Sequence, residues 1–279
     1  PSRADRVMSG EPWAGSVRGA AKGASRMSDH RNRVALVTGG GRGIGEAVAR
    51  RLAREGLRVA VLGRQLADLQ RVAEAVGGFA VACDLTDPVA THAALADVAS
   101  ALGPVDVLVN NAGLAESLPF EKTTDAVWDR TMALNVTAPM RLCRALVPAM
   151  ARRGWGRVIN VASNAGLRGY AYTAAYCASK HALVGLTRAL AVEFASKGVS
   201  INAVCPGFVD TEMSARSVAK ISATTKRSAE EARAALEALS PQRRLMTVEE
   251  VAHAVWSLVP HEARGIHGQC IALDGGQTA

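Results

Sequence analysis

The chain has 279 residues, of which 49% are hydrophobic, and it carries a formal net charge of +8. This length and composition suffice for one large α/β domain, and no apolar run is long enough to cross a bilayer. Basic residues are spread along the chain and only 4% of residues are aromatic, so the basic stripe with stacking rings that nucleic-acid binding favours is missing. We therefore expect binding to neither nucleic acid nor membrane.

Cysteine and histidine usage points away from disulfides and metals. The five cysteines are scattered and form no CxxC motif, and the six histidines form no ligand-like cluster with acids. The first residues lack the basic-then-apolar pattern of a secretory signal. We expect reduced thiols, no bound metal and a cytoplasmic protein.

Residues 1–26 differ in composition from the rest of the chain. They begin with Pro, are rich in Gly, Ala, Ser and Arg, and show no apolar period, whereas an apolar strand pattern starts shortly after Met27. We predict a flexible extension over residues 1–30, of native or vector origin, and a single domain over residues 31–279.

Short apolar runs alternate with helix-sized segments through this domain. The runs are residues 33–38, 58–62, 79–83, 105–110, 157–162, 200–204 and 269–273. They are rich in Val, Ile and Leu with little in–out alternation, which is typical of strands buried on both faces. The pattern predicts a single-domain, Rossmann-like, doubly wound α/β fold: a parallel sheet of about seven strands with helices on both faces.

One long polar stretch, residues 210–245, interrupts the alternation after the sixth strand. Ligands of such sheets bind beyond the carboxyl ends of the strands, so we interpret this stretch as a substrate lid. A solvated helical hairpin is the alternative.

A glycine cluster, "TGGGRGIG", follows the first strand and opens a helix. Gly39, Gly43 and Gly45 remove the side chains that would block a tight turn and the close approach of a diphosphate, and the helix N-terminus offers free N–H groups. The spacing differs from the usual G-x-G-x-x-G fingerprint, and a simple tight turn is the alternative.

The second strand ends in Gly63 and Arg64, where a cofactor with a free ribose 2′-hydroxyl usually meets an acidic residue. Arginine is a good bidentate partner for a 2′-phosphate, and Arg42 in the glycine loop offers a second cation. The pattern favours NADP(H), with NAD(H) as the second choice, unless both are ordinary surface arginines.

Tyr176 and Lys180 are spaced i, i+4 on a predicted helix, which puts the phenol and the ammonium on one face. A nearby ammonium favours the phenolate, and we expect it to lower the pKa of Tyr176. Tyr170 and Tyr172 lack a lysine at i+4. Spacing alone leaves an ordinary helix face equally open.

Several motifs occur in a characteristic order: "TGGGRGIG", "CDL", "NNAG", "ALNV", "VASNAG", "YCASK" and "PGFVDT". In order and separation they resemble the classical short-chain dehydrogenase/reductases over residues 31–279, and more closely the bacterial 3-oxoacyl thioester reductases and aromatic-polyketide ketoreductases. The resemblance implies NADPH-dependent reduction of a ketone to a secondary alcohol, with a 3-oxoacyl thioester of CoA or acyl carrier protein as the expected substrate. It also implies a homotetramer.

The resemblance assigns four catalytic residues. Tyr176 is the proton donor, Lys180 supports it and binds the cofactor ribose, Ser163 orients the substrate carbonyl, and Asn135 holds a water that relays protons toward Lys180. The alternatives are a serine that satisfies backbone groups at a strand end and an asparagine that merely kinks its helix.

It also assigns a cofactor site. The expected cofactor-binding residues are Gly39, Arg42, Gly43, Ile44, Gly45, Arg64, Asp84, Leu85, Asn111, Ala112, Gly113, Tyr176, Lys180, Pro206, Gly207, Val209 and Thr211. Within this set, Asp84 and Thr211 have a second interpretation as helix N-caps.

Two rival functions remain open from the sequence. One is an NAD-linked dehydrogenase that oxidises a hydroxyacyl-CoA or another secondary alcohol, against which Arg64 argues. The other is a non-catalytic, cofactor-sensing binding protein, against which the complete catalytic set argues. The basic residues of the predicted lid suit a phosphate-bearing thioester, but exposed helices are commonly charged.

Overall fold

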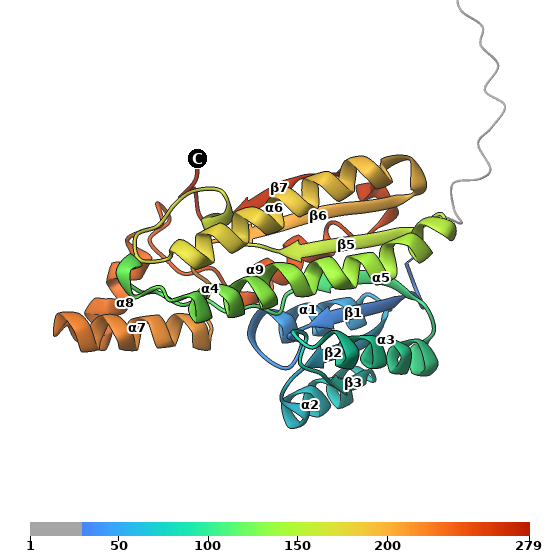
Figure 1. Cartoon of the computed structure of the whole chain (residues 1–279), viewed down its shortest axis with the longest axis horizontal. Helices are drawn as coiled ribbons and strands as arrows, with labels where there is room; N and C mark the ends of the chain where they lie inside the picture. Colours follow the sequence, from blue (N-terminus) through green and yellow to red (C-terminus); the bar gives the residue numbers. More distant parts are fainter. Residues whose placement is uncertain (1–29) are drawn as a thin grey trace, which may run out of the picture.

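The computed structural model describes residues 30–279, so residues 1–29 of the predicted extension lie outside the described residues. The described chain forms one parallel sheet in the order β3-β2-β1-β4-β5-β6-β7 (Figure 1). All the predicted strands are present: β1 (Val34–Thr38), β2 (Arg58–Gly63), β3 (Phe79–Ala82), β4 (Val105–Asn110), β5 (Gly156–Val161), β6 (Val199–Pro206) and β7 (Cys270–Leu273).

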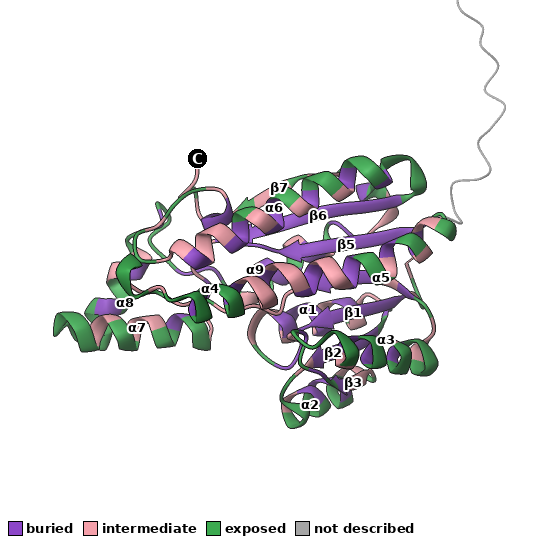
Figure 2. Cartoon of the chain, in the orientation of Figure 1, coloured by how far each residue is buried: buried purple, intermediate pink, exposed green. Residues whose placement is uncertain are grey.

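Helices cover both faces of the sheet, and the strands alternate their side chains between two hydrophobic layers. On β1, Ala35 and Val37 pack into the layer beneath α1 (Gly43–Arg54), α2 (Leu66–Val76) and α9 (Val248–Trp256). Val34 and Leu36 pack into the opposite layer with α3 (Pro88–Leu102), α5 (Ala138–Arg152) and α6 (Ala174–Phe194). Figure 2 shows the central strands buried throughout. This explains why the strands read as continuous apolar runs.

The strand order reverses between β1 and β4, which lie side by side in the centre of the sheet. The chain leaves β1 toward β2 and β3, and returns through α3 to β4 and the other half of the sheet. A crevice opens beyond the carboxyl ends of the strands at such a switch point. The predicted fold class is confirmed, and it predicts where a ligand binds.

The stretch after β6 forms a helical hairpin of α7 (Glu212–Thr225) and α8 (Ala229–Glu237), which projects at the left of Figure 1. Its contact with the body of the protein includes a hydrogen bond from Lys220 Nζ to the carbonyl oxygen of Ser117. None of the helices among residues 30–279 is long and apolar enough to cross a membrane.

Candidate active site

Tyr176 and Lys180 lie one turn apart on α6, which begins at Ala174. The Nζ atom of Lys180 lies 5.7 Å from the centroid of the Tyr176 ring. Lys180 is 5% exposed, and its Nζ donates a hydrogen bond of 2.9 Å to the carbonyl oxygen of Val161 at the end of β5. The i, i+4 pair is therefore no solvated helix face, because its lysine is held inside the protein.

Burial dominates the ionisation of this pair. It raises the pKa of Tyr176, and a hydrogen bond with Ser163 acts in the opposite direction. It also lowers the pKa of Lys180 to about 8. The prediction that the lysine lowers the pKa of Tyr176 is therefore wrong for the chain by itself. The physical reason is that a low-dielectric surrounding disfavours both charged forms, phenolate and ammonium alike.

Ser163 follows β5 and is 8% exposed. Its hydroxyl oxygen accepts a hydrogen bond of 3.1 Å from the backbone N–H of Ala165, as expected for a serine that satisfies backbone groups at a strand end. Because the same hydroxyl reaches Tyr176, it lies where a carbonyl oxygen held by the phenol would also meet it. The interaction with the backbone is thus observed, and the role of Ser163 in orienting a substrate carbonyl stays a prediction.

Asn135 is buried in a π-helical turn, Ala133–Thr137, between α4 (Asp125–Met132) and α5. Its Oδ1 accepts from the N–H of Leu114 at 2.9 Å, and its Nδ2 donates to the Leu114 carbonyl at 2.9 Å and to the Ser179 hydroxyl at 3.0 Å. Single π turns occur frequently at functional sites. The side chain thus fastens the segment after Gly113 to α6 beside Lys180, and its role in holding a water stays a prediction.

The glycine loop between β1 and α1 fits a dinucleotide diphosphate. Gly39 and Gly43 have positive φ values of 63° and 54°. A Cβ on Gly43 would meet nothing closer than the Thr211 methyl group at 3.5 Å, so this side of the turn is open. The N-cap residue Arg42 makes no side-chain capping hydrogen bond, which leaves N–H groups of the first turn for an anion.

The loop is also braced from α2. Arg71 donates to the carbonyl oxygen of Gly41 at 2.9 Å and forms a bidentate pair with Glu46 at 2.8 and 2.7 Å. This pair lowers the pKa of Glu46. It fixes the conformation of the loop before any ligand binds.

Arg42 lies in the glycine loop and Arg64 directly follows β2. Arg42 pairs with Glu212 at 2.8 Å. Arg64 acts electrostatically on Asp84, whose pKa is lowered chiefly by hydrogen bonds from Thr86. Asp84 does not cap the next helix: the N-cap of α3 is Asp87, which accepts from Val89 and Ala90. That alternative for Asp84 is excluded.

The "NNAG" segment closes β4 against β1 and the active-site helix. Asn111 donates to the carbonyl oxygen of Thr38 at 2.9 Å. A Cβ on Gly113 would lie 3.1 Å from Asn135 Oδ1 and 3.7 Å from Lys180 Nζ, so this glycine lets the backbone pass close to the catalytic group. The "NNAG" segment and the Lys180 ammonium are therefore neighbours, and the role of this segment in cofactor binding stays a prediction.

The "PGFVDT" segment leads from β6 into α7. Thr211 occupies the N-cap position of α7, but its side chain makes no capping bond, and its hydroxyl donates to the Val209 carbonyl at 3.3 Å. The alternative that the Thr211 side chain caps α7 is therefore excluded. At the start of the segment, Gly207 packs closely against Asp274 of the C-terminal segment. A Cβ on Gly207 would lie only 3.0 Å from the Asp274 Cβ.

Comparison with known proteins decides the family. The family model for short chain dehydrogenases matches residues 33–222. This chain belongs to the short chain dehydrogenase family. It is 36% identical over 246 residues to the 3-oxoacyl-acyl-carrier-protein reductase of Vibrio cholerae, covering 88% of this chain and 96% of the relative. It is 34% identical over 257 residues to a D-beta-hydroxybutyrate dehydrogenase of Rhizobium meliloti, covering 88% and 99%.

Among solved structures, a variant of actinorhodin polyketide ketoreductase with NADPH has a TM-score of 0.86 and 36% identity. The match covers 91% of this chain and 99% of that one. These likenesses confirm the predicted resemblance to 3-oxoacyl reductases and polyketide ketoreductases. The short chain dehydrogenase described here is thus an oxidoreductase that acts on alcohol or ketone groups.

Three residues of this short chain dehydrogenase support the site and are missing from the sequence prediction. They are Arg71, Glu212 and Asp274. The Asp274 carboxylate accepts hydrogen bonds from Gly276, Gln277 and Thr278, and so folds the C-terminal segment back toward Gly207. Arg71 and Glu212 are marked by no local pattern, because their partners Glu46 and Arg42 lie 25 and 170 residues away in the sequence.

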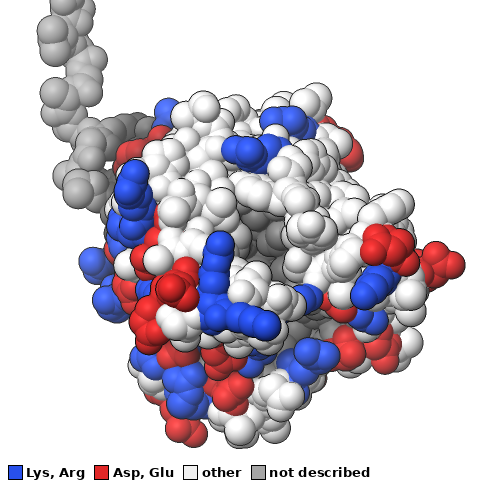
Figure 3. All heavy atoms as spheres, turned by 90° about the vertical axis from the view of Figure 1, so that its left-hand side faces the viewer, with Lys and Arg blue, Asp and Glu red and all other residues white. Residues whose placement is uncertain are grey.

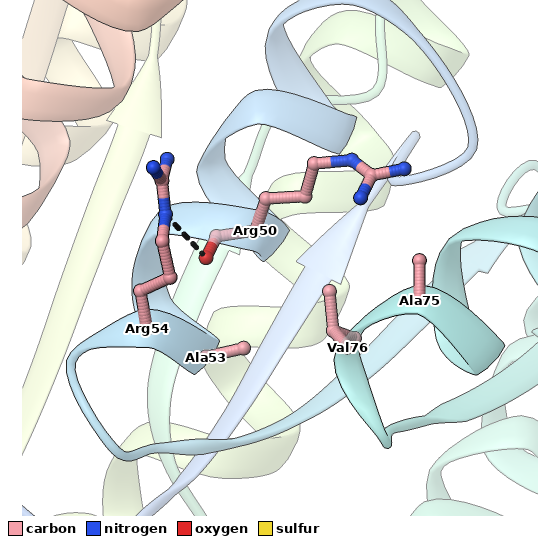
Figure 4. A pocket seen from close by; sticks show the side chains of 5 residues that line it. All are labelled: Arg50, Ala53, Arg54, Ala75 and Val76. Atoms are coloured by element: carbon pink, nitrogen blue, oxygen red, sulfur yellow. Dashed lines mark hydrogen bonds between the residues drawn. The ribbon is translucent and has the colours of Figure 1, made fainter.

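Figure 3 shows the face of the molecule that carries α7 and α8, and a hollow opens in it with Lys and Arg as well as Asp and Glu around it. A separate groove lies between α1 and α2, lined by Arg50, Ala53, Arg54, Ala75 and Val76 (Figure 4). It contains none of the predicted site residues. Within residues 30–279, no group of His, Cys, Asp and Glu could hold a metal ion.

Proposed function

We propose that this short chain dehydrogenase reduces a ketone to a secondary alcohol with NADPH, with a 3-oxoacyl thioester of CoA or acyl carrier protein as the expected substrate. One observation carries the proposal: Ser163, Tyr176 and Lys180 meet beside Gly113, at the switch point where the glycine loop opens. The cofactor would supply a hydride to the carbonyl carbon. The remaining chemistry is a proton transfer that the protein itself performs.

The proton comes from the phenol of Tyr176. Because burial raises the pKa of this tyrosine, the phenol is protonated at neutral pH and ready to donate to the carbonyl oxygen. Ser163 would donate a second hydrogen bond to that oxygen and stabilise the negative charge that develops there. The Lys180 ammonium lies 5.7 Å from the centroid of the ring. It would stabilise the negative charge of the phenolate that remains after the proton has been transferred.

The cofactor-binding residues would divide the dinucleotide between them. The first turn of α1 would hold the diphosphate, and Lys180 would donate to the nicotinamide ribose. Val209 and Thr211 would meet the carboxamide, while Asp84 and Leu85 would flank the adenine. Arg42 and Arg64 would hold the 2′-phosphate, and these two cations support NADP(H) over NAD(H).

We propose that residues 210–245, which include α7 and α8, form a lid over the substrate site. The substrate would enter beneath these two helices. Lys and Arg at the rim of this face suit the phosphates of CoA or of a carrier-protein arm (Figure 3). We expect a homotetramer in the cytoplasm. Two apolar side chains, Trp128 on α4 and Val192 on α6, are 40% and 83% exposed and are available for contacts between subunits; light scattering tests the oligomeric state.

The deciding experiment measures loss of reduced-nicotinamide absorbance with acetoacetyl-CoA, using NADPH and NADH in parallel. Turnover with NADPH that disappears in Tyr176→Phe would support the reductase, its cofactor and its proton donor together. Turnover with neither cofactor would reject the thioester and require a panel of free ketones and alcohols. Arg64→Asp should shift preference toward NADH, and an unchanged preference would reject the role of Arg64.

A further inference from the structure

An ion pair joins the glycine loop to the first residue of α7. The Arg42 guanidinium lies 2.8 Å from the Glu212 carboxylate, although the two residues are far apart in the sequence. The same carboxylate oxygen lies 3.8 Å from Arg216, one turn further along α7. Glu212 therefore has two cations within reach, one on the glycine loop and one on its own helix.

This contact lies where the loop and the lid meet most closely. The Thr211 methyl group, next to Glu212, is the nearest atom to a Cβ built on Gly43, at 3.5 Å. The ion pair itself is exposed, with 55% of the Arg42 side chain and 64% of the Glu212 side chain accessible. A ligand that reaches the glycine loop can therefore compete with Glu212 for Arg42.

The neighbouring cation, Arg71, is not available to replace Arg42. Its guanidinium is committed to the Glu46 carboxylate through two short bonds and to the Gly41 carbonyl. Glu212, by contrast, loses little when Arg42 leaves, because Arg216 can take its charge at i+4. The arrangement thus favours an exchange of partners at Arg42.

We propose that Glu212 is a specificity-determining residue for the cofactor: its carboxylate holds Arg42, and a 2′-phosphorylated nucleotide must displace it. The inference rests on the proposed use of NADP(H), and it adds a residue that limits the affinity for that cofactor. A nucleotide with a free 2′-hydroxyl does not compete for Arg42. Glu212 therefore weakens the binding of NADPH and leaves the binding of NADH unchanged.

The test measures dissociation constants by calorimetry at low ionic strength for NADPH and NADH, and for the fragments 2′,5′-ADP and AMP. Removing one exposed ion pair should tighten binding of NADPH and 2′,5′-ADP to Glu212→Gln by about twofold to fivefold. NADH and AMP should bind as they do to wild type. The tightening should shrink at high salt, because exposed charges are screened.

A double-mutant cycle shows whether Glu212 acts through Arg42. In an Arg42→Gln background, Glu212→Gln should have no further effect on the binding of NADPH. Glu230→Gln is the matched control, because it removes an acid from the first turn of α8 that accepts from Ser228 rather than from an arginine. It should leave all four dissociation constants unchanged.

The outcomes separate this inference from the proposed function. If Arg42→Gln weakens NADPH alone but Glu212→Gln changes nothing, NADP(H) use stands and the role of Glu212 is rejected. If Glu212→Gln tightens all four ligands, or Glu230→Gln acts equally, the effect is general charge and the role is again rejected. If wild type does not distinguish NADPH from NADH and Arg42→Gln has no effect, both the cofactor assignment and this inference fail.

Discussion

Gly45 is the position where a single methyl group should do most damage to cofactor binding. A Cβ built there lies 2.1 Å from the Gly39 carbonyl oxygen and 2.6 Å from Asn111 Nδ2, whereas ordinary contacts begin at 3.4 Å. Because the carbonyl belongs to the backbone, Gly45→Ala must move the loop away from α1 by about 1 Å, at a cost of about 1–3 kcal/mol in the free energy of unfolding. We expect a displacement of that size at this loop to weaken the binding of NADPH by about 100-fold.

The assay combines NADPH titration by calorimetry with thermal unfolding, at a temperature where the variant remains folded. Gly185→Ala provides the control, because a Cβ there meets nothing within 4 Å on the surface of α6. It should raise the free energy of unfolding by about 0.5–1 kcal/mol and leave NADPH binding unchanged. A folded Gly45→Ala protein that binds NADPH with wild-type affinity would refute the steric argument.

Two further predictions concern buried polar groups. Burial lowers the pKa of Lys180 to about 8, so kcat/KM for reduction should fall as the pH rises through about 8. Lys180→Arg should move this fall to higher pH. A pH profile that stays flat through this range would contradict the role of the Lys180 ammonium. The buried Asn160 amide donates a hydrogen bond of 2.8 Å to the Thr187 hydroxyl. Thr187→Val leaves this donor without its acceptor, so it should lower the free energy of unfolding, measured by chemical denaturation, by about 1–3 kcal/mol. Thr224→Val is the exposed control and should not lower it.

The strands and the proximity of Tyr176 to Lys180 were predictable because both are local in the sequence. A parallel strand buried on both faces is a short apolar run, and Tyr176 and Lys180 are joined by the period of the helix itself. The sheet then brings the ends of β1, β4 and β5 together, since parallel strands end at the same edge. Ser163 and Gly113 consequently meet Tyr176 and Lys180 without any pairing that the sequence has to specify separately.

Local sequence leaves alternatives open where two interpretations compete. Asp84 and Asp87 both precede α3, and Pro88 after Asp87 marks the true N-cap, because proline is favoured in the first turn. The π turn around Asn135 has no such mark, since one extra residue in a helix barely changes its apolar period. Contacts such as that of Arg42 with Glu212 depend on how α7 packs against the glycine loop, which local sequence does not determine.

The pKa shifts of Tyr176 and Lys180 have one physical origin, and they bear on the proposed proton transfer. Burial raises the pKa of the phenol and lowers that of the ammonium to about 8, so at neutral pH the phenol is neutral and most of the ammonium is still protonated. A neutral phenol is a proton donor, which carbonyl reduction needs, whereas alcohol oxidation needs the phenolate as a base. Oxidation must therefore work against the burial of Tyr176, while reduction uses the protonation state that burial already favours. The protonation state of Tyr176 in the free protein is therefore consistent with the proposed reduction.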